Sequence, residues 1–286
     1  MIGPLLHTML RINDISFSID GKPLFERASA VIPKGHKVGI VGRNGTGKTT
    51  LFRLIRKEWS LDSGSIEYPV HYRVGGVEQE APSNNVSLLD TVLAADVEYA
   101  SLNTEAETAT DPMRIAEIYE RLSEINAHSA ESRAATILAG LGFDNKAQIR
   151  SCAEFSGGWR MRVALGSVLF SQPDLLLLDE PTNYLDLEGS AWLESFLAKY
   201  GQTVLVISHD RGLLNRSVTG ILHLNNLKLR YQTGGYDQFD YERRLRLEQQ
   251  LVTKKKQDEQ RAHIQSFVDR FRYKASKARQ AQSRLK

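Results

Sequence analysis

The sequence predicts an α/β protein with a layered sheet core. Three short, continuous apolar runs, at residues 38–41, 175–178 and 204–207, suit strands that are covered on both faces. The first run leads into a glycine-rich loop, and residues 49–56 after that loop have helix-forming character. With 286 residues, of which 41% are hydrophobic, the chain can bury a substantial core.

A small antiparallel β element is expected before the first buried strand. Residues 12–17 alternate apolar and polar side chains, residues 21–23 read as a turn, and residues 28–32 resume an extended pattern.

A helical insertion is expected at about 86–170, inside a first domain of residues 1–238. Apolar residues there recur at spacings of three and four, as at Ile115, Ile118, Tyr119 and Leu122. This period is typical of helices that bury one face.

Residues 239–286 predict a long, exposed and basic helix with a bend near residues 274–277. The segment has no proline or glycine, and residues 241–286 hold 14 Lys or Arg against 5 Asp or Glu. The net charge of the whole chain is only +3, so its basic character is concentrated in this tail.

Composition argues against export and membrane insertion. No run approaches the roughly 18–20 apolar residues of a membrane helix. The single cysteine, Cys152, has no partner in the sequence for a disulfide and no Cys or His cluster around it. We therefore expect a cytoplasmic protein.

The glycine-rich loop matches a complete phosphate-binding pattern. Its backbone N–H groups would surround phosphate oxygens at the positive end of the following helix. Lys48 would reach the β and γ phosphates, and the Thr49 hydroxyl would ligate Mg²⁺. The predicted nucleotide-binding residues are Gly42, Arg43, Asn44, Gly45, Thr46, Gly47, Lys48, Thr49 and Thr50.

Two carboxylates, Asp179 and Glu180, directly follow the apolar run at 175–178. Alone, such a pair could cap a strand or begin a helix. After a complete phosphate loop, the pattern predicts that Asp179 holds Mg²⁺ and that Glu180 polarises the attacking water.

Further motifs resemble those of ATP-binding cassette proteins, which implies a P-loop NTPase core. The run Phe-Ser-Gly-Gly-Trp at 155–159 looks like the family's signature motif, and residues 181–186 resemble its D-loop. The resemblance assigns a catalytic switch role to His209, and a catalytic and metal-binding role to Gln79. It also implies that Ser156, Gly157 and Gly158 bind the γ-phosphate of ATP held by an opposite cassette.

Phe17 is the early aromatic residue that the resemblance offers for stacking on adenine. Two positions later the chain has Ile19 instead. Phe17 also fits the apolar alternation of its strand, so the sequence leaves it open between a stacking residue and a core residue.

The Arg-Met-Arg extension at 160–162 resembles the ABC-F branch of this family more than membrane transporter subunits, which remain the alternative. Residues 264–284 are similar to the linker between the two ABC-F cassettes, here truncated at Lys286. The resemblance implies an ATPase whose ATP-closed form binds the ribosome near its exit site, with rRNA and tRNA as partners of the linker and no membrane partner. A second cassette, from the same full-length chain or from a homodimer, would complete the ATP sites.

Overall fold

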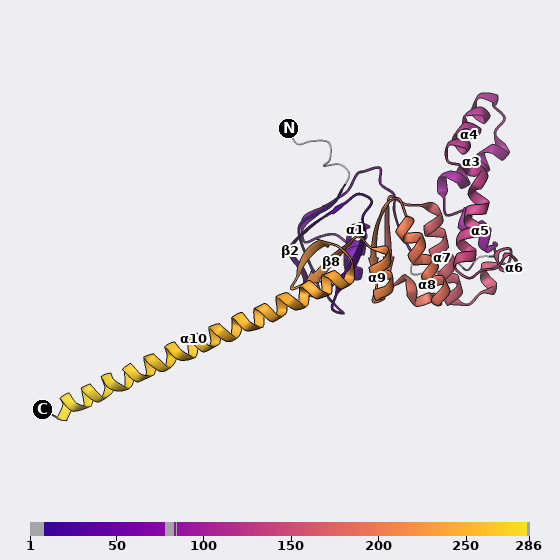
Figure 1. The fold of residues 1–286 in the computed structure, drawn as a ribbon. Helices are drawn as coiled ribbons and strands as arrows, with labels where there is room; N and C mark the ends of the chain where they lie inside the picture. Colours follow the sequence, from indigo (N-terminus) through magenta and orange to yellow (C-terminus); the bar gives the residue numbers. More distant parts are fainter. Residues whose placement is uncertain (1–8, 78–82, 84, 285–286) are drawn as a thin grey trace. The chain divides into compact units, whose positions relative to one another are not determined.

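The computed structural model describes residues 9–77, 83 and 85–284. They divide into two compact units, Met1–Tyr236 and Asp237–Lys286, and each is described by itself (Figure 1). The strands of the first unit are β1 (Met9–Ile19), β2 (Lys22–Pro33), β3 (Lys37–Gly42), β4 (Ser63–Glu67), β5 (Val74–Gly76), β6 (Leu175–Asp179), β7 (Thr203–Ile207), β8 (Gly220–Asn225) and β9 (Lys228–Thr233).

The expected antiparallel element is a three-stranded sheet in the order β2-β1-β4. β1 and β2 form a hairpin in which Ile19 pairs with Lys22, so its turn is Asp20–Gly21. Both turn residues have positive φ, 50° and 76°, as a two-residue type I′ turn requires. The sequence predicted a turn at residues 21–23, but the turn consists of Asp20 and Gly21. These two residues adopt the turn conformation, and Lys22 already belongs to β2.

The second sheet has six strands in the order β5-β6-β7-β3-β8-β9. Its strands are parallel except for the antiparallel pair β8 and β9. Four consecutive residues of β6 and all five of β7 are buried, which explains their unbroken apolar sequences. The α/β fold class is confirmed.

The main core contains side chains of both sheets and of α1 (Lys48–Ile55). Leu51, Phe52, Leu54 and Ile55 of α1 are all buried. α9 (Arg211–Ser217) packs closely on β3, because a Cβ at Gly39 would lie 2.6 Å from Leu214 Cδ2. Glycine at this position permits the short distance between helix and strand.

A helical region follows β5 in the chain. Its α-helices are α2 (Leu88–Leu93), α3 (Val97–Thr108), α4 (Pro112–Glu124), α5 (Ala130–Gly140), α6 (Asn145–Gln148) and α7 (Gly157–Ser171). α3 and α4 lie side by side and project away from the sheets (Figure 1). α5 also contacts α8 (Leu187–Lys199), where Gly140 lies directly against the indole of Trp192.

The second unit consists of α10 (Tyr236–Arg284), a helix of 49 residues. It continues without interruption through residues 274–277, so the expected bend there was wrong. The segment contains no proline or glycine to break the backbone hydrogen-bond pattern. Among the described residues of the chain, no helix combines the length and apolar character that a membrane span needs.

Candidate nucleotide-binding site

The phosphate loop lies between the end of β3 and the first turn of α1. Gly45 and Gly47 have φ of 78° and 96°, in the left-handed region that favours glycine. A Cβ at Gly47 would also lie 3.2 Å from Phe25 Cζ and 3.4 Å from Leu24 Cβ. Backbone conformation and close packing therefore both require glycine at position 47.

Contacts within the loop fix its shape. The Lys48 ammonium donates hydrogen bonds to the carbonyl oxygens of Gly42 and Arg43, at 3.0 and 3.3 Å. The Thr46 hydroxyl donates to the same Arg43 carbonyl at 2.8 Å. Lys48 is thus held across the loop, where its positive charge can attract a bound anion.

Thr49 and Asp179 come together from distant parts of the chain. The Thr49 hydroxyl, in the first turn of α1, donates a hydrogen bond of 2.7 Å to Asp179 Oδ2 at the end of β6. Because β6 lies two strands from β3 in the same sheet, both groups reach the carboxyl edge of the strands.

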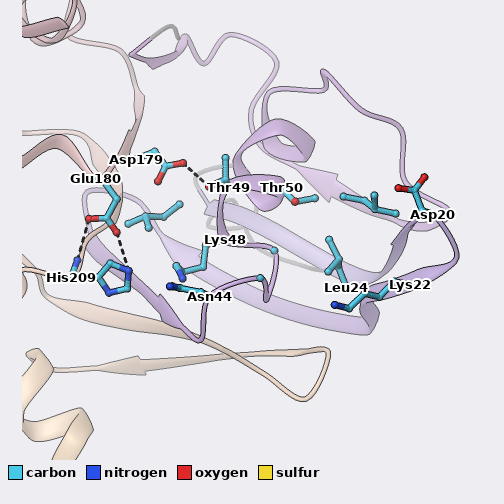
Figure 2. Close-up of a pocket in the computed structure, with 14 residues that line it drawn as sticks. Asp20, Lys22, Leu24, Asn44, Lys48, Thr49, Thr50, Asp179, Glu180 and His209 are labelled. Atoms are coloured by element: carbon cyan, nitrogen blue, oxygen red, sulfur yellow. Dashed lines mark hydrogen bonds and ion pairs between the residues drawn. The ribbon is translucent and has the colours of Figure 1, made fainter. Parts of the chain in front are cut away.

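Glu180 lies beside His209 at the same edge of the sheet (Figure 2). Its Oε2 accepts a 3.3 Å hydrogen bond from the His209 backbone N–H, and its Oε1 lies 3.4 Å from His209 Nε2. Glu180 has φ of 47°, and its own N–H donates to the Ile207 carbonyl at 2.9 Å. Burial raises the pKa of the Glu180 carboxyl, and the neighbouring His209 acts in the opposite direction.

A cavity of about 740 Å³ joins these groups, a size typical of small-molecule sites. The lining residues are Ile19, Asp20, Lys22, Leu24, Asn44, Gly45, Gly47, Lys48, Thr49, Thr50, Asp179, Glu180, Ile207 and His209. Gly42, Arg43 and Thr46 do not line it, although Arg43 and Thr46 are bonded to each other in the loop.

The donor set fits Mg²⁺ with a nucleoside triphosphate. Mg²⁺ prefers oxygen ligands and usually takes one or two protein carboxylates plus substrate phosphates. Asp179 and Thr49 provide one carboxylate and one hydroxyl beside the phosphate loop. Within the described residues, no group of three or more His, Cys, Asp or Glu side chains forms a separate metal site.

The structure does not bring the signature residues to this cavity. Ser156, Gly157 and Gly158 are exposed at the start of α7, and a Cβ added at either glycine would meet no atom within 4 Å. Ser156 is the N-cap residue but makes no side-chain capping hydrogen bond. The start of α7 is therefore open to another molecule or domain.

Arg162 links α7 to the segment that follows Glu180. Its guanidinium donates to the carbonyls of Tyr184 and Leu141, at 2.6 and 3.1 Å, and to Asp186 Oδ2 at 2.9 Å. It also lies 4.3 Å from the ring centroid of Trp159. The Gly189 amide and the Arg162 guanidinium hold the pKa of Asp186 below its ordinary value.

Two sequence predictions meet a different outcome. Phe17 is 8% exposed within the core, with its ring centroid 5.8 Å from that of Trp59. It belongs to the hydrophobic core and does not line the cavity, which favours the core interpretation of the two that the sequence left open. Gln79 lies outside the residues that the structure describes.

Apart from Ile207 at the end of β7, sequence reasoning missed three lining residues, Asp20, Lys22 and Leu24. They belong to the β1–β2 hairpin, far from the phosphate loop in sequence. The Asp20–Gly21 pair between two alternating segments was the available signal for a two-residue hairpin.

Taken together, the two sheets, the phosphate loop and the carboxylates at the end of β6 define an ATP-binding cassette. A family model described as "ABC transporter" matches residues 25–183, and a second with the same description matches residues 222–286. The chain therefore belongs to the ABC transporter family, in its F branch.

The similar curated proteins support this branch. The chain is 44% identical over 281 residues to "Probable ATP-binding protein YheS" of Haemophilus influenzae, covering 97% of this chain and 44% of that protein. It is 42% identical to "ATP-binding cassette sub-family F member 3" of Homo sapiens, covering 97% and 40%. It is 40% identical to "ABC transporter F family member 3" of Arabidopsis thaliana, covering 97% and 42%. The chain thus spans less than half the length of these relatives.

Solved structures share the fold. "Structure of ATP binding subunit of ABC transporter" matches with a TM-score of 0.61 and 18% identity, over 79% of this chain and 90% of the other. "An inward-facing conformation of a putative metal-chelate type ABC transporter." matches with a TM-score of 0.57 and 23% identity, over 79% and 83%. At these identities the likeness concerns the fold alone.

Proposed function

We propose that this chain is the ATP-binding and ATP-hydrolysing cassette of a ribosome-associated translation factor. In its ATP-closed form, the factor binds the ribosome near the exit site. The observation that carries the proposal is a long basic helix directly after a complete cassette, in a chain of the F branch. A membrane transporter subunit has no evident use for such a helix.

The proposed chemistry is hydrolysis of the γ-phosphate of ATP. Mg²⁺, when bound, would neutralise the charge that develops on the phosphate oxygens. Lys48 and the loop N–H groups would bind the phosphates, and Thr49 with Asp179 would hold the metal, assisted by Gln79. Glu180 orients a water molecule for attack, and His209 holds the Glu180 carboxylate in place at 3.4 Å.

A second cassette would complete the site. Ser156, Gly157 and Gly158 are exposed at the N-terminus of α7, a 15-residue helix whose first N–H groups suit a phosphate. In the proposed closed state they contact ATP held by the other cassette, which belongs to the same full-length chain or to a second copy of it.

Contact with the ribosome is attributed to α10. Residues 241–286 hold 14 Lys or Arg against 5 Asp or Glu, and Lys254, Lys255 and Lys256 form an exposed run on the helix. Such a surface attracts the phosphate backbone of rRNA and tRNA, with an affinity that decreases as salt rises. A cytoplasmic location goes with this role.

The test is sedimentation of the Glu180→Gln protein with ribosomes through a sucrose cushion, with and without ATP. Lys48→Ala serves as the nucleotide-binding control, and the natural two-cassette chain is run alongside. We expect pelleting that requires both ATP and Lys48. If neither chain pellets with ribosomes, the translation role is wrong and the transporter alternative leads.

A second arm of the experiment tests α10. Replacing Lys254, Lys255 and Lys256 with Gln should weaken pelleting and reduce its dependence on salt. The matched control replaces three exposed cassette lysines, Lys34, Lys146 and Lys199, with Gln. Equal loss in both triple variants would contradict a specific role of the helix.

A further inference from the structure

The cavity has two chemically different ends. Glu180 and His209 lie at one end and the phosphate loop lies in the middle, whereas the β1–β2 hairpin forms the other end (Figure 2). A nucleotide whose γ-phosphate faces Glu180 and His209 would therefore direct its base towards the hairpin residues Ile19, Asp20, Lys22 and Leu24.

The hairpin end is held in place. The Asp20–Gly21 turn is the shortest kind of hairpin connection, and it fixes the pairing of Ile19 with Lys22. Leu24 packs against the phosphate loop, where a Cβ at Gly47 would lie 3.4 Å from Leu24 Cβ. The backbone of the hairpin therefore fixes the positions of Ile19 and Leu24, which a base would contact.

The hairpin end is aliphatic. Ile19 and Leu24 are partly buried and pack on the core, whereas Asp20 and Lys22 are exposed. Among the lining residues that the structure describes, the only ring is that of His209, at the opposite end. Phe17 and Phe25, the aromatic residues of the two hairpin strands nearest to the lining residues, are both buried in the core.

Aliphatic contacts discriminate poorly between bases. Strong rejection of a wrong substrate comes from buried polar groups that are left unpaired, whereas an apolar surface discriminates only weakly. Asp20 and Lys22 are exposed, so water can satisfy them whichever base is bound. The loop N–H groups, Lys48 and Thr49 recognise the triphosphate, which is the same in every nucleoside triphosphate.

We propose that this cavity accepts nucleoside triphosphates with little selection of the base, so that GTP, CTP and UTP bind nearly as well as ATP. The inference rests on the proposed nucleotide-binding function and names its substrate class more broadly. Ile19 contributes to the low selectivity, because it lines the hairpin end of the cavity with an aliphatic side chain.

The primary test is calorimetric titration of the Glu180→Gln chain with the Mg²⁺ complexes of ATP, GTP, CTP and UTP. We expect the four dissociation constants to agree within about tenfold, a difference equivalent to about 1.4 kcal/mol. A preference of more than tenfold for ATP over any other nucleotide overturns the inference alone. Failure of all four to bind contradicts the nucleotide site itself.

A gain-of-function variant tests the assignment of Ile19. Ile19→Tyr should tighten purine nucleotides by roughly tenfold, since stacking on an aromatic ring is worth about 1–3 kcal/mol per base, and should leave inorganic tripolyphosphate unchanged. Val31→Tyr places the same ring on β2 at a half-exposed position outside the cavity, and equal tightening there would overturn the role of Ile19.

Discussion

The hydroxyl of Thr49 donates a 2.7 Å hydrogen bond to Asp179, joining residues 130 positions apart in the chain. The contact holds the first turn of α1 against the end of β6. It also places the two proposed Mg²⁺ ligands side by side.

Thr49→Val should impair Mg²⁺-dependent nucleotide binding. The change keeps the shape of the side chain but removes its hydroxyl, and hydrogen bonds to charged groups contribute about 1.5–3 kcal/mol. We expect roughly ten- to hundredfold weaker binding of Mg²⁺-ATP by calorimetry, with little change when Mg²⁺ is absent. Thr49→Ser restores the hydroxyl and should bind normally; equal loss in both variants would argue against metal ligation.

Glu180→Gln should preserve ATP binding and lower hydrolysis by orders of magnitude, because the amide cannot act as a base towards water. The measurement is steady-state phosphate release by the full two-cassette protein. Glu188→Gln, an exposed change on α8, is the control. Near-normal turnover of Glu180→Gln would remove Glu180 from the mechanism.

The raised pKa of Glu180 predicts a second effect, on stability. Its folded-state pKa lies above the unfolded value, so the folded protein binds the proton more tightly, and stability falls as pH rises through the raised pKa. Glu180→Gln should therefore unfold at higher urea concentration than the parent at pH 8. The difference should shrink towards pH 4; an equal difference at both pH values would assign it to packing instead.

Phe17→Ala should destabilise the cassette by about 3–5 kcal/mol, as expected for removing a large buried ring. Urea unfolding measures the loss. ATP affinity, measured where the variant is still folded, should stay within a few-fold of the parent, because Phe17 does not line the cavity. A stable variant with much weaker ATP binding would restore the stacking interpretation.

Arg162→Met should loosen the connection between α7 and the segment after Glu180. The Arg162 side chain is only 11% exposed and donates to three different elements. Loss of these bonds should cost about 2–3 kcal/mol in urea unfolding and increase amide hydrogen exchange at residues 182–186. Asp186→Asn keeps an oxygen that can cap α8, so we expect it to lose less stability in urea than Arg162→Met. A larger loss for Asp186→Asn than for Arg162→Met would contradict this account.

Sequence pattern was sufficient for the sheet core, because strands buried on both faces must be continuously apolar. It also located the phosphate loop and the carboxylate pair. In each of these motifs, local backbone geometry sets the spacing of the residues along the chain. The sequence could not decide the role of Phe17. The alternation of apolar and polar residues shows which face of the strand carries Phe17, but not what covers that face. Trp59, 42 positions away, supplies that cover.

The hairpin lining was missed for a related reason. Asp20, Lys22 and Leu24 have no motif of their own, and the packing of Leu24 and Phe25 against Gly47 brings the hairpin to the phosphate loop. The helix continues through residues 274–277, where a bend was expected, because this segment contains no proline or glycine to interrupt it.

Gly140 presents bare backbone to the flat indole of Trp192 where α5 crosses α8. A Cβ at position 140 would lie 2.0 Å from Trp192 Cε2, so any side chain there would push α5 and α8 apart. Glycine at this position therefore determines how closely the helical region can pack on α8.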